Sequence, residues 1–147
     1  MSLVSSISEF ELIERLNNII IENTSSSENI IMGIGDDAAV INPIGKKNVV
    51  TTDAMVENTH FMYETVNFID LGWKSLATNY SDIAAMGCKP FHSVVTLGLN
   101  PDQKISHIED IYKGLCELTN EAGGNIVGGD IIKSDTFFIS ITATGFS

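Results

Sequence analysis

The sequence predicts an α+β fold, a two-layer domain in which a mixed β-sheet carries two long helices on one face. Two observations predict it. Apolar side chains recur at helical spacing over residues 68–86 and 106–122. Runs rich in β-branched and aromatic residues lie at 49–53, 92–99 and 136–146, and such runs are typical of strands. Because these helices and strands alternate along 147 residues, we expect them to share one hydrophobic core in a single domain.

The first part of the chain carries a helix and the first long strand. A helix is expected over residues 8–21, where Ser8 can act as N-cap and apolar side chains recur every three or four positions. A polar break follows at 23–29, and then a short apolar segment at 30–35. The β-branched run at 49–53 predicts a strand that ends at an acid.

Glycines mark the ends of the two long helices. The helix over 68–86 is followed by Gly87, and the helix over 106–122 is followed by Gly123. A glycine closes a helix well because it adopts the left-handed backbone that many helix C-termini require. The run between the two helices reads as a buried strand, and the alternating segment at 136–146 reads as the last one.

Composition excludes several classes of function. The net charge is −11, with 19 acidic and 8 basic residues, which argues against binding to nucleic acid or to an anionic membrane. The charge suits a protein that gathers cations, although an acidic soluble surface explains most of it. No apolar run approaches the ~20 residues of a membrane span, and no secretory signal is visible. Cys88 and Cys116 belong to no zinc motif, so we expect free thiols in a reducing cytoplasm.

Five carboxylates are candidates for chemistry because they adjoin glycines or the ends of predicted elements. They are Asp36, Asp37, Asp53, Asp82 and Asp130. Mg²⁺ takes oxygen ligands, and phosphate-transfer sites combine a few carboxylates with phosphate oxygens. Any one of these acids alone more commonly forms a turn or a helix cap. Their presence in four separate segments favours a shared cation site.

Asp82 is the most informative of these acids. Its helical neighbours three and four positions away include no cation. It therefore needs a metal or a donor from elsewhere in the fold if it is desolvated. The chain has no P-loop motif and no Ser/His/Asp nucleophile arrangement. Of the histidines, His92 and His107 read as strand-edge and helix-surface residues, and His60 is the one candidate for substrate contact.

Four motifs occur in the order and spacing of thiamine-monophosphate kinases. They are Gly-Ile-Gly-Asp-Asp-Ala-Ala at 33–39, Thr-Asp-Ala-Met-Val-Glu-Asn-Thr-His-Phe at 52–61, the block at 72–87, and Val-Gly-Gly-Asp at 127–130. Over nearly its whole length the chain resembles the N-terminal domain of that family. The segment at 79–87 is also shared with aminoimidazole ribonucleotide synthetases, selenophosphate synthetases and hydrogenase-maturation proteins.

The resemblance implies an activity and its partners. The family transfers a phosphoryl group from ATP, with several Mg²⁺ ions, directly to thiamine phosphate, and no covalent or general-base residue is needed. It also implies a homodimer in which two such sheets meet. Residues 1–147 would be the N-terminal Mg·ATP-binding domain of a longer chain. Because the segment at 137–146 ends without a helix or polar tail, we expect a truncated chain whose isolated form is inactive.

The resemblance also implies roles for individual residues. The metal ligands of the family are matched by Asp37, Asp53, Asp82 and Asp130, and further oxygen ligands by Thr51 and Thr52. The nucleotide contacts are matched by Tyr112, Gly129 and Asp130, and a thiamine phosphate contact by His60.

Two departures leave alternatives open. Ile131 and Ile132 replace two threonines that usually follow Gly-Gly-Asp, and Asn58 and Thr59 stand where glycine is usual before the histidine. One alternative is another ATP-dependent synthetase of the superfamily, such as the aminoimidazole ribonucleotide type. Selenophosphate synthetase is disfavoured, since no Cys precedes residue 36. The other alternative is a nucleotide-binding module without turnover.

Overall fold

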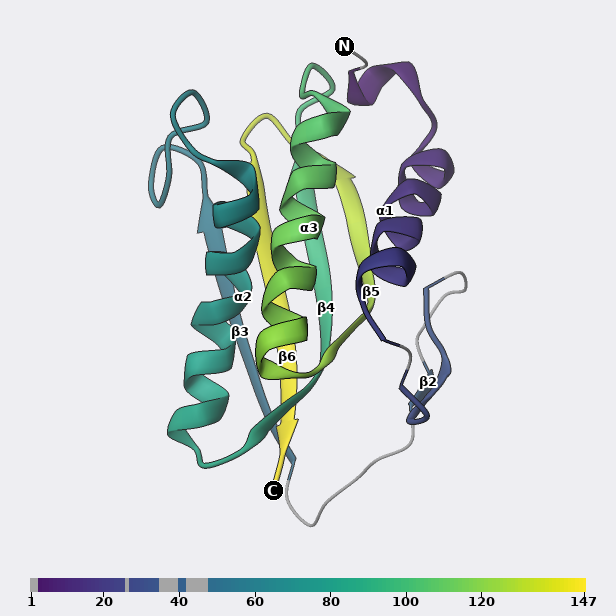
Figure 1. Ribbon diagram of the computed structural model, residues 1–147. Helices are drawn as coiled ribbons and strands as arrows, with labels where there is room; N and C mark the ends of the chain where they lie inside the picture. The colour runs from purple at the N-terminus through teal and green to yellow at the C-terminus, as the bar shows by residue number, and fades with distance from the viewer. Residues whose placement is uncertain (1–2, 26, 35–39, 42–47) are drawn as a thin grey trace.

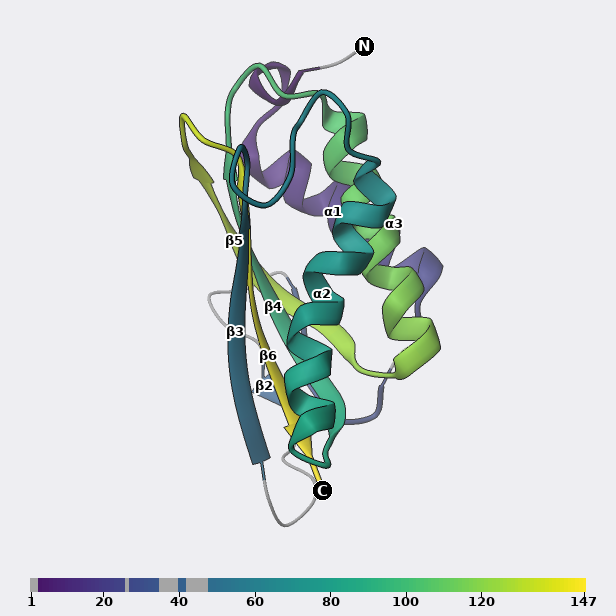
Figure 2. The ribbon, with the colours of Figure 1, turned by 90° about the vertical axis from the view of Figure 1, so that its left-hand side faces the viewer.

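A four-stranded mixed sheet carries the helices of the protein on one face (Figures 1 and 2). The computed structural model describes residues 3–25, 27–34, 40–41 and 48–147, with residues 40–41 described by their backbone alone. The elements in chain order are a 3-10 turn at Val4–Ser6, α1 at Glu9–Asn23, β1 at Ile30–Met32, β2 at Val40–Ile41, β3 at Asn48–Val56, α2 at Phe68–Ala85, β4 at Lys89–Leu99, α3 at Ile105–Ala122, β5 at Asn125–Lys133 and β6 at Phe138–Phe146.

The sheet places strands from both halves of the chain side by side. Its order is β3-β6-β4-β5, with β6 antiparallel to both β3 and β4, and with β4 parallel to β5. The register of β3 on β6 runs without a break from Asn48 opposite Phe146 to Val56 opposite Phe138. β1 and β2 pair separately as a small antiparallel sheet. The predicted α+β class and mixed sheet are confirmed.

Local signals place the helix ends. The Ser8 side chain accepts a hydrogen bond from the Glu11 amide at 3.2 Å, as predicted for an N-cap. Asn67 caps α2 in the same way. Gly87 and Gly123 both adopt positive φ, of 69° and 85°, after the last turns of α2 and α3. The predicted helix stops are therefore confirmed, with the usual shift of a residue or two at each end.

The core lies between the sheet and the helices. Along β6, Ile139, Ile141 and Ala143 are fully buried against the helices, while the intervening Ser140 and Thr142 face the opposite side. Of the described elements, no helix covers that opposite face (Figure 2). α1 adds Leu12, Leu16 and Ile20 to the core beside α3.

α2 and α3 touch backbone to backbone. A Cβ added to Gly114 would lie 1.9 Å from the Ile69 carbonyl oxygen, and one added to Gly72 would lie 2.0 Å from the Ile111 carbonyl oxygen. Only glycine permits this approach. The close contact sets the position of α2 over the sheet, and with it the position of Asp82.

One prediction about the histidines is wrong. His92 lies in β4, which is an inner strand, and it is only 3% exposed. Its ring packs against Phe91 with centroids 3.7 Å apart. His107 is half-buried, and its Nδ1 lies 2.8 Å from the Tyr63 hydroxyl. The residue pattern of β4 could not show that β6 and β5 would lie on either side of it, and so could not show that His92 would be buried.

Candidate functional site

The strongest polar contact among the predicted site residues joins β3 to α2. The Thr51 hydroxyl donates a hydrogen bond to Oδ2 of Asp82 at 2.8 Å. Asp82 is exposed and forms no salt bridge with the described residues. Because Asp82 is exposed, the condition under which it would need a donor is not met, but a strand hydroxyl does contact it, and its Oδ1 has no protein partner among the described residues.

Strand alternation divides the neighbouring predicted ligands between two faces. Thr51, Asp53 and Met55 share one face of β3, and Met55 is buried in the core, so this is the helix-covered face. Asp53 is exposed at the sheet edge on this side. Thr52 lies on the opposite face, where its hydroxyl donates to the Ile141 carbonyl at 3.0 Å and accepts from Thr142 at 3.1 Å.

Three further predicted residues lie together at the other edge of the sheet. Tyr112, Gly129 and Asp130 line one hollow between α1 and β5, and its remaining walls are Ile13, Leu16, Ile34, Gly128 and Ile131. Burial raises the pKa of the Tyr112 phenol well above its ordinary value, so the hydroxyl remains protonated and can donate a hydrogen bond. The hollow thus combines a largely apolar wall with one phenol, and Asp130 lies at its margin.

The structure does not bring these two groups of residues together within one chain. β3 and β5 are separated by β6 and β4, which puts the strands about 14 Å apart at about 4.8 Å per step. Asp130 also lies on the face opposite to Ile131, whose side chain packs on the core. Among the described residues, no three His, Cys, Asp or Glu side chains are close enough to hold a metal ion together. Asp36 and Asp37 lie outside the described residues.

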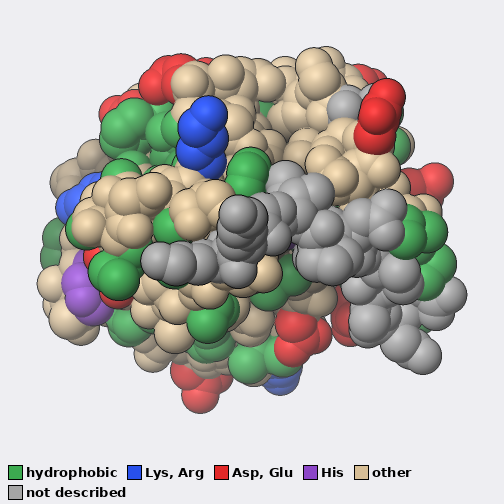
Figure 3. All heavy atoms as spheres, turned by 90° about the horizontal axis from the view of Figure 1, so that it is seen from below, with side chains coloured by type: hydrophobic (Ala, Val, Ile, Leu, Met, Phe, Trp, Pro, Cys, Tyr) green, Lys and Arg blue, Asp and Glu red, His purple; other side chains and the backbone are tan. Residues whose placement is uncertain are grey.

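The donor chemistry at β3 nevertheless fits Mg²⁺. Thr51, Asp53 and Asp82 offer oxygen atoms alone, and the two carboxylates are exposed to solvent. Mg²⁺ is usually held by one or two carboxylates, with water and phosphate oxygens completing its octahedron. The acidic residues are otherwise dispersed. In Figure 3, Asp and Glu side chains are scattered over the visible described surface and form no single patch.

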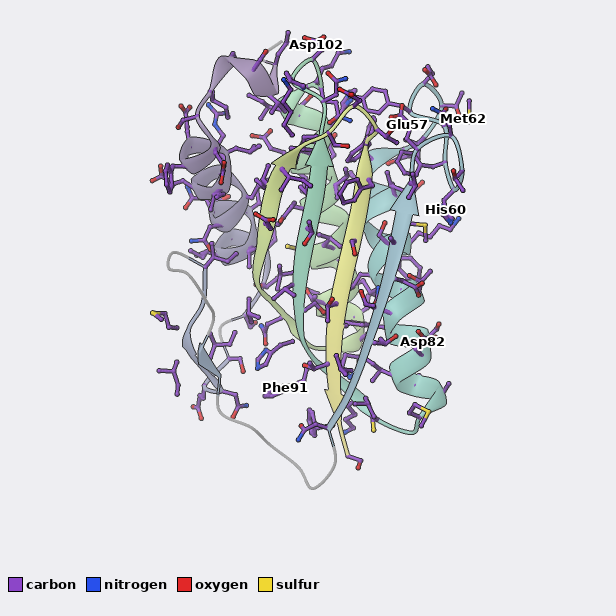
Figure 4. All side chains as sticks on the ribbon, turned by 180° about the vertical axis from the view of Figure 1, so that it is seen from behind. Glu57, His60, Met62, Asp82, Phe91 and Asp102 are labelled. Atoms are coloured by element: carbon purple, nitrogen blue, oxygen red, sulfur yellow. The ribbon has the colours of Figure 1, made fainter. Side chains whose placement is uncertain are left out.

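His60 lies in the connection that follows β3 (Figure 4). Its Nδ1 accepts a hydrogen bond from the Val56 amide at 3.0 Å, and its own amide donates to the Val56 carbonyl at 2.8 Å. Asn58 has a φ of 61°, the single positive value among described non-glycine residues. Asparagine tolerates this conformation better than most residues other than glycine, which is consistent with its place in this tight connection.

A cleft lies at the same end of the sheet. Its walls come from three connections and are Glu57, Asn58, Tyr63, Asn100, Asp102, Gln103 and Asp135. Figure 4 shows Glu57, His60, Met62 and Asp102 at this end, with Asp82 well below them beside β3. The Glu57 carboxylate also accepts from the Phe137 amide at 3.2 Å, which ties the connection after β3 to the turn before β6.

Sequence reasoning missed a set of buried polar groups under β4. Within the part of the chain that the structure describes, five buried atoms have no hydrogen-bond partner: Asn79 Oδ1, Tyr80 Oη, Ser93 Oγ and both ring nitrogens of His92. Burial lowers the pKa of His92 to about 4 and raises that of Tyr80 to about 12. No motif marks these residues, because their common feature is burial. The two cysteines are free thiols, as predicted, and burial raises the pKa of Cys116 to about 11.

Comparison with known proteins identifies the class. Residues 35–147 match the family model described as AIR synthase related protein, N-terminal domain. The match covers more than half of the chain, and the chain therefore belongs to this family. Among the described helices, none combines the length and apolar character that crossing a bilayer requires.

Several proteins similar to this chain are thiamine-monophosphate kinases. That of Synechococcus elongatus is 37% identical over 113 residues, which are 76% of this chain and 35% of that protein. The crystal structure of the Stenotrophomonas maltophilia K279a enzyme is 36% identical with a TM-score of 0.75, covering 95% of this chain and 42% of that one. The structure of AaThiL complexed with AMPPCP and TMP is 32% identical with a TM-score of 0.67, covering 99% and 43%. The chain thus spans about two fifths of the length of these relatives.

Proposed function

We propose that this chain is the N-terminal Mg·ATP-binding domain of an enzyme that phosphorylates thiamine phosphate to thiamine diphosphate. The observation that carries the proposal is the paired Thr51 hydroxyl and Asp82 carboxylate, set beside Asp53 in a chain related to thiamine-monophosphate kinases. AMPPCP and TMP, the ligands of AaThiL, support ATP and thiamine phosphate as the two substrates.

Each predicted residue then has a physical role. Asp53 and Asp82, with Thr51, hold Mg²⁺ on the helix-covered side of β3. Thr52, on the opposite face of β3, and Asp37 and Asp130, from other segments, supply oxygen ligands to further Mg²⁺ ions. When bound, Mg²⁺ neutralises charge on the phosphoryl group during transfer. The Tyr112 hydroxyl donates to the nucleotide, and Gly129 lets the nucleotide approach the β5 backbone.

The reaction requires positioning more than a protein nucleophile. A phosphate oxygen of thiamine phosphate is already anionic and can attack the γ-phosphorus in line, so no strong general base is needed. Residues on β3 and β5 hold the two reactants in place. Transfer is direct, without a phosphorylated side chain.

A homodimer would complete the site. The predicted ligands lie at opposite edges of the sheet, and the face without helices exposes Val50, Val94 and Ile132, which are 71%, 39% and 43% exposed. Two copies joined through this face would bury that apolar surface. They would also bring β3 of one copy towards β5 of the other. We place this dimer in the cytoplasm, in keeping with its free thiols.

The test is turnover by the whole protein at saturating Mg·ATP, with thiamine phosphate compared with formylglycinamidine ribonucleotide. Formation of thiamine diphosphate is the expected result. Ring closure of the purine precursor would assign the protein to the aminoimidazole ribonucleotide synthetases instead. Binding of Mg·ATP with no turnover would favour the non-catalytic module, for which the Ile131 and Ile132 replacements are the one supporting observation.

The metal assignment has its own test. Asp53→Asn and Asp82→Asn should each reduce turnover sharply at limiting Mg²⁺. Asp70→Asn is the control, since Asp70 is an exposed acid in the first turn of the same helix as Asp82. Near-normal turnover of both site variants at limiting Mg²⁺ would refute the metal assignment.

A further inference from the structure

A hydrogen bond and a group of aromatic contacts join the connection at 57–67, between β3 and α2, to the start of α3. The Tyr63 hydroxyl and Nδ1 of His107 are hydrogen-bonded at 2.8 Å. The His107 ring also stacks on Phe68, with centroids 4.0 Å apart and planes inclined by 17°. Tyr63 makes edge-to-face contacts with Phe68 at 5.1 Å and with the buried Phe137 at 6.1 Å. This connection, both long helices and the turn before β6 therefore meet at one point.

The same contact joins two walls of the cleft at this end of the sheet. Tyr63 lines the cleft together with Glu57 of the same connection. Another wall, at 100–103, leads directly into α3, whose first turn holds His107. A second contact fixes the connection to the turn before β6, where the Glu57 amide donates to the Phe137 carbonyl at 2.9 Å. The shape of the cleft therefore depends on contacts that the connection makes with both of its neighbours.

The hydrogen bond between Tyr63 and His107 contributes direction more than stability. Burial raises the pKa of the Tyr63 phenol and lowers that of His107, so both groups are uncharged near neutral pH. A hydrogen bond between neutral groups adds little net free energy to a fold. Apolar packing is non-directional, whereas a hydrogen bond is restricted in distance and angle. The Tyr63–His107 pair therefore selects one position of the connection among those that ring packing alone would allow.

We propose that Tyr63 and His107 are positioning residues, which hold the connection at 57–67 in the arrangement that binds thiamine phosphate. This inference rests on the proposed function, and His60, the predicted thiamine phosphate contact, lies in the same connection. The backbone of His60 is bonded to the end of β3, and the Tyr63–His107 pair fixes the connection three residues further along. Neither ring of the pair needs to touch the substrate.

The Tyr63–His107 pair is separate from the predicted metal and nucleotide contacts. Five residues of β3 lie between Thr51, which contacts Asp82, and Val56, where the connection begins, and this corresponds to about 17 Å of strand. The predicted nucleotide contacts line a different hollow, between α1 and β5. Loss of the pair should therefore raise the KM for thiamine phosphate while leaving kcat and the KM for ATP nearly unchanged.

The kinetic test uses the whole protein in steady-state assays, with each substrate varied in turn. Tyr63→Phe, which removes the hydroxyl alone, should raise the KM for thiamine phosphate about 3- to 10-fold, the size of one neutral hydrogen bond. His107→Phe, which keeps a ring to stack on Phe68, should do the same, and the double variant should be no worse than either. His107→Asn, whose amide can occupy the place of Nδ1, should recover part of the loss. Thr65→Ala, at an exposed position of the same connection, is the control.

Amide hydrogen exchange tests the Tyr63–His107 pair without any assumption about activity. Within the connection, the Val66 amide donates to the Met62 carbonyl at 3.0 Å. This amide should exchange about 3- to 10-fold faster in Tyr63→Phe and in His107→Phe, because the connection then opens more often. In Thr65→Ala it should exchange as in the wild type.

The possible failures are distinguishable. Unchanged exchange of Val66 in both ring variants would show that the Tyr63–His107 pair does not hold the connection. Faster exchange with an unchanged KM for thiamine phosphate would overturn the positioning role, while leaving the kinase proposal intact. Equal rises in the KM for ATP and for thiamine phosphate would show a general structural effect and overturn it as well. Absence of thiamine phosphate turnover by the wild type would overturn the proposed function itself, and with it this inference.

Discussion

The substitution Gly114→Ala tests whether the close contact between α2 and α3 is required for stability. The added methyl group would lie 1.9 Å from the Ile69 carbonyl oxygen and 2.8 Å from the Trp73 amide nitrogen. Real Cβ atoms essentially never approach closer than 3.0 Å, so the helices must separate by at least 1.1 Å at this point. Both obstacles are backbone atoms, which cannot turn aside as a flexible side chain would.

Two opposing terms set the size of the effect. Overpacking of a core typically destabilises a protein by about 1–3 kcal/mol, and a backbone obstacle belongs at the upper end of this range. Alanine is intrinsically better than glycine inside a helix by about 1 kcal/mol. The expected net loss is therefore about 2 kcal/mol, which for a domain of this size lowers Tm by about 4–8 °C.

The assay is thermal and urea unfolding of Gly114→Ala beside the wild type. Glu117→Ala, one turn further along α3 and exposed, is the matched control and should change the free energy of unfolding by less than about 0.5 kcal/mol. A Gly114→Ala protein as stable as the wild type, or more stable, would refute the reasoning, because helix propensity alone would then govern the position.

Three further predictions concern the site and the core. Thr51→Val should weaken Mg²⁺ binding, measured by calorimetry, by about 10-fold, but should have no further effect in an Asp82→Asn background if Thr51 acts by orienting that carboxylate. Gly129→Ala should lower both Tm and ATP affinity, because the added Cβ would lie 2.0 Å from the Val95 carbonyl oxygen of the neighbouring strand. Gly128→Ala should have a smaller effect, since its Cβ would lie 3.6 Å from the Val94 side chain, an ordinary contact. Burial lowers the pKa of His92 from 6.5 to about 4, so the unfolded chain takes up a proton first and the free energy of unfolding should fall as the pH drops through that interval. His92→Gln should flatten this part of the pH dependence in urea titrations.

Each of these has a result that contradicts it. Equal effects of Thr51→Val with and without the Asp82 carboxylate would mean that the hydroxyl acts independently, as a direct ligand. Equal behaviour of the two glycine variants would remove the steric argument for β5. If the free energy of unfolding of the His92→Gln protein falls with decreasing pH as steeply as that of the wild type, carboxylates and not His92 cause the acid sensitivity.

The sequence was sufficient where a feature depends on neighbours in the chain. Apolar spacing and the following glycines placed α2 and α3 to within a residue, and Ser8 was correctly predicted as a cap. The end of β3 was less predictable. The strand was expected to stop at Asp53 but continues to Val56, because it pairs with β6 more than 80 residues away. The residues next to β3 in the sequence do not indicate that β6 will pair with it, so its full length could not be predicted.

The candidate site could be predicted from the sequence only to the same extent. The absence of a nearby cation marked Asp82 as a candidate, but nothing in the sequence showed that the carboxylate is exposed or that Thr51 donates to it. Likewise Thr51 and Thr52 adjoin in the chain and face opposite sides of the sheet, so that one contacts Asp82 and the other bonds within the sheet. Proximity in a motif does not mean proximity in the site.

The strand order also has a consequence for biosynthesis. β4, α3 and β5 form a contiguous unit that can pair soon after it leaves the ribosome, whereas β3 must wait for β6, the last of the described strands. During translation the segment with Thr51 and Asp53 is therefore an unpaired strand with β-branched residues open to other chains. Its assembly into a sheet is delayed until residue 146 has been synthesised, which makes this interval the stage at which a chaperone would protect the nascent protein most.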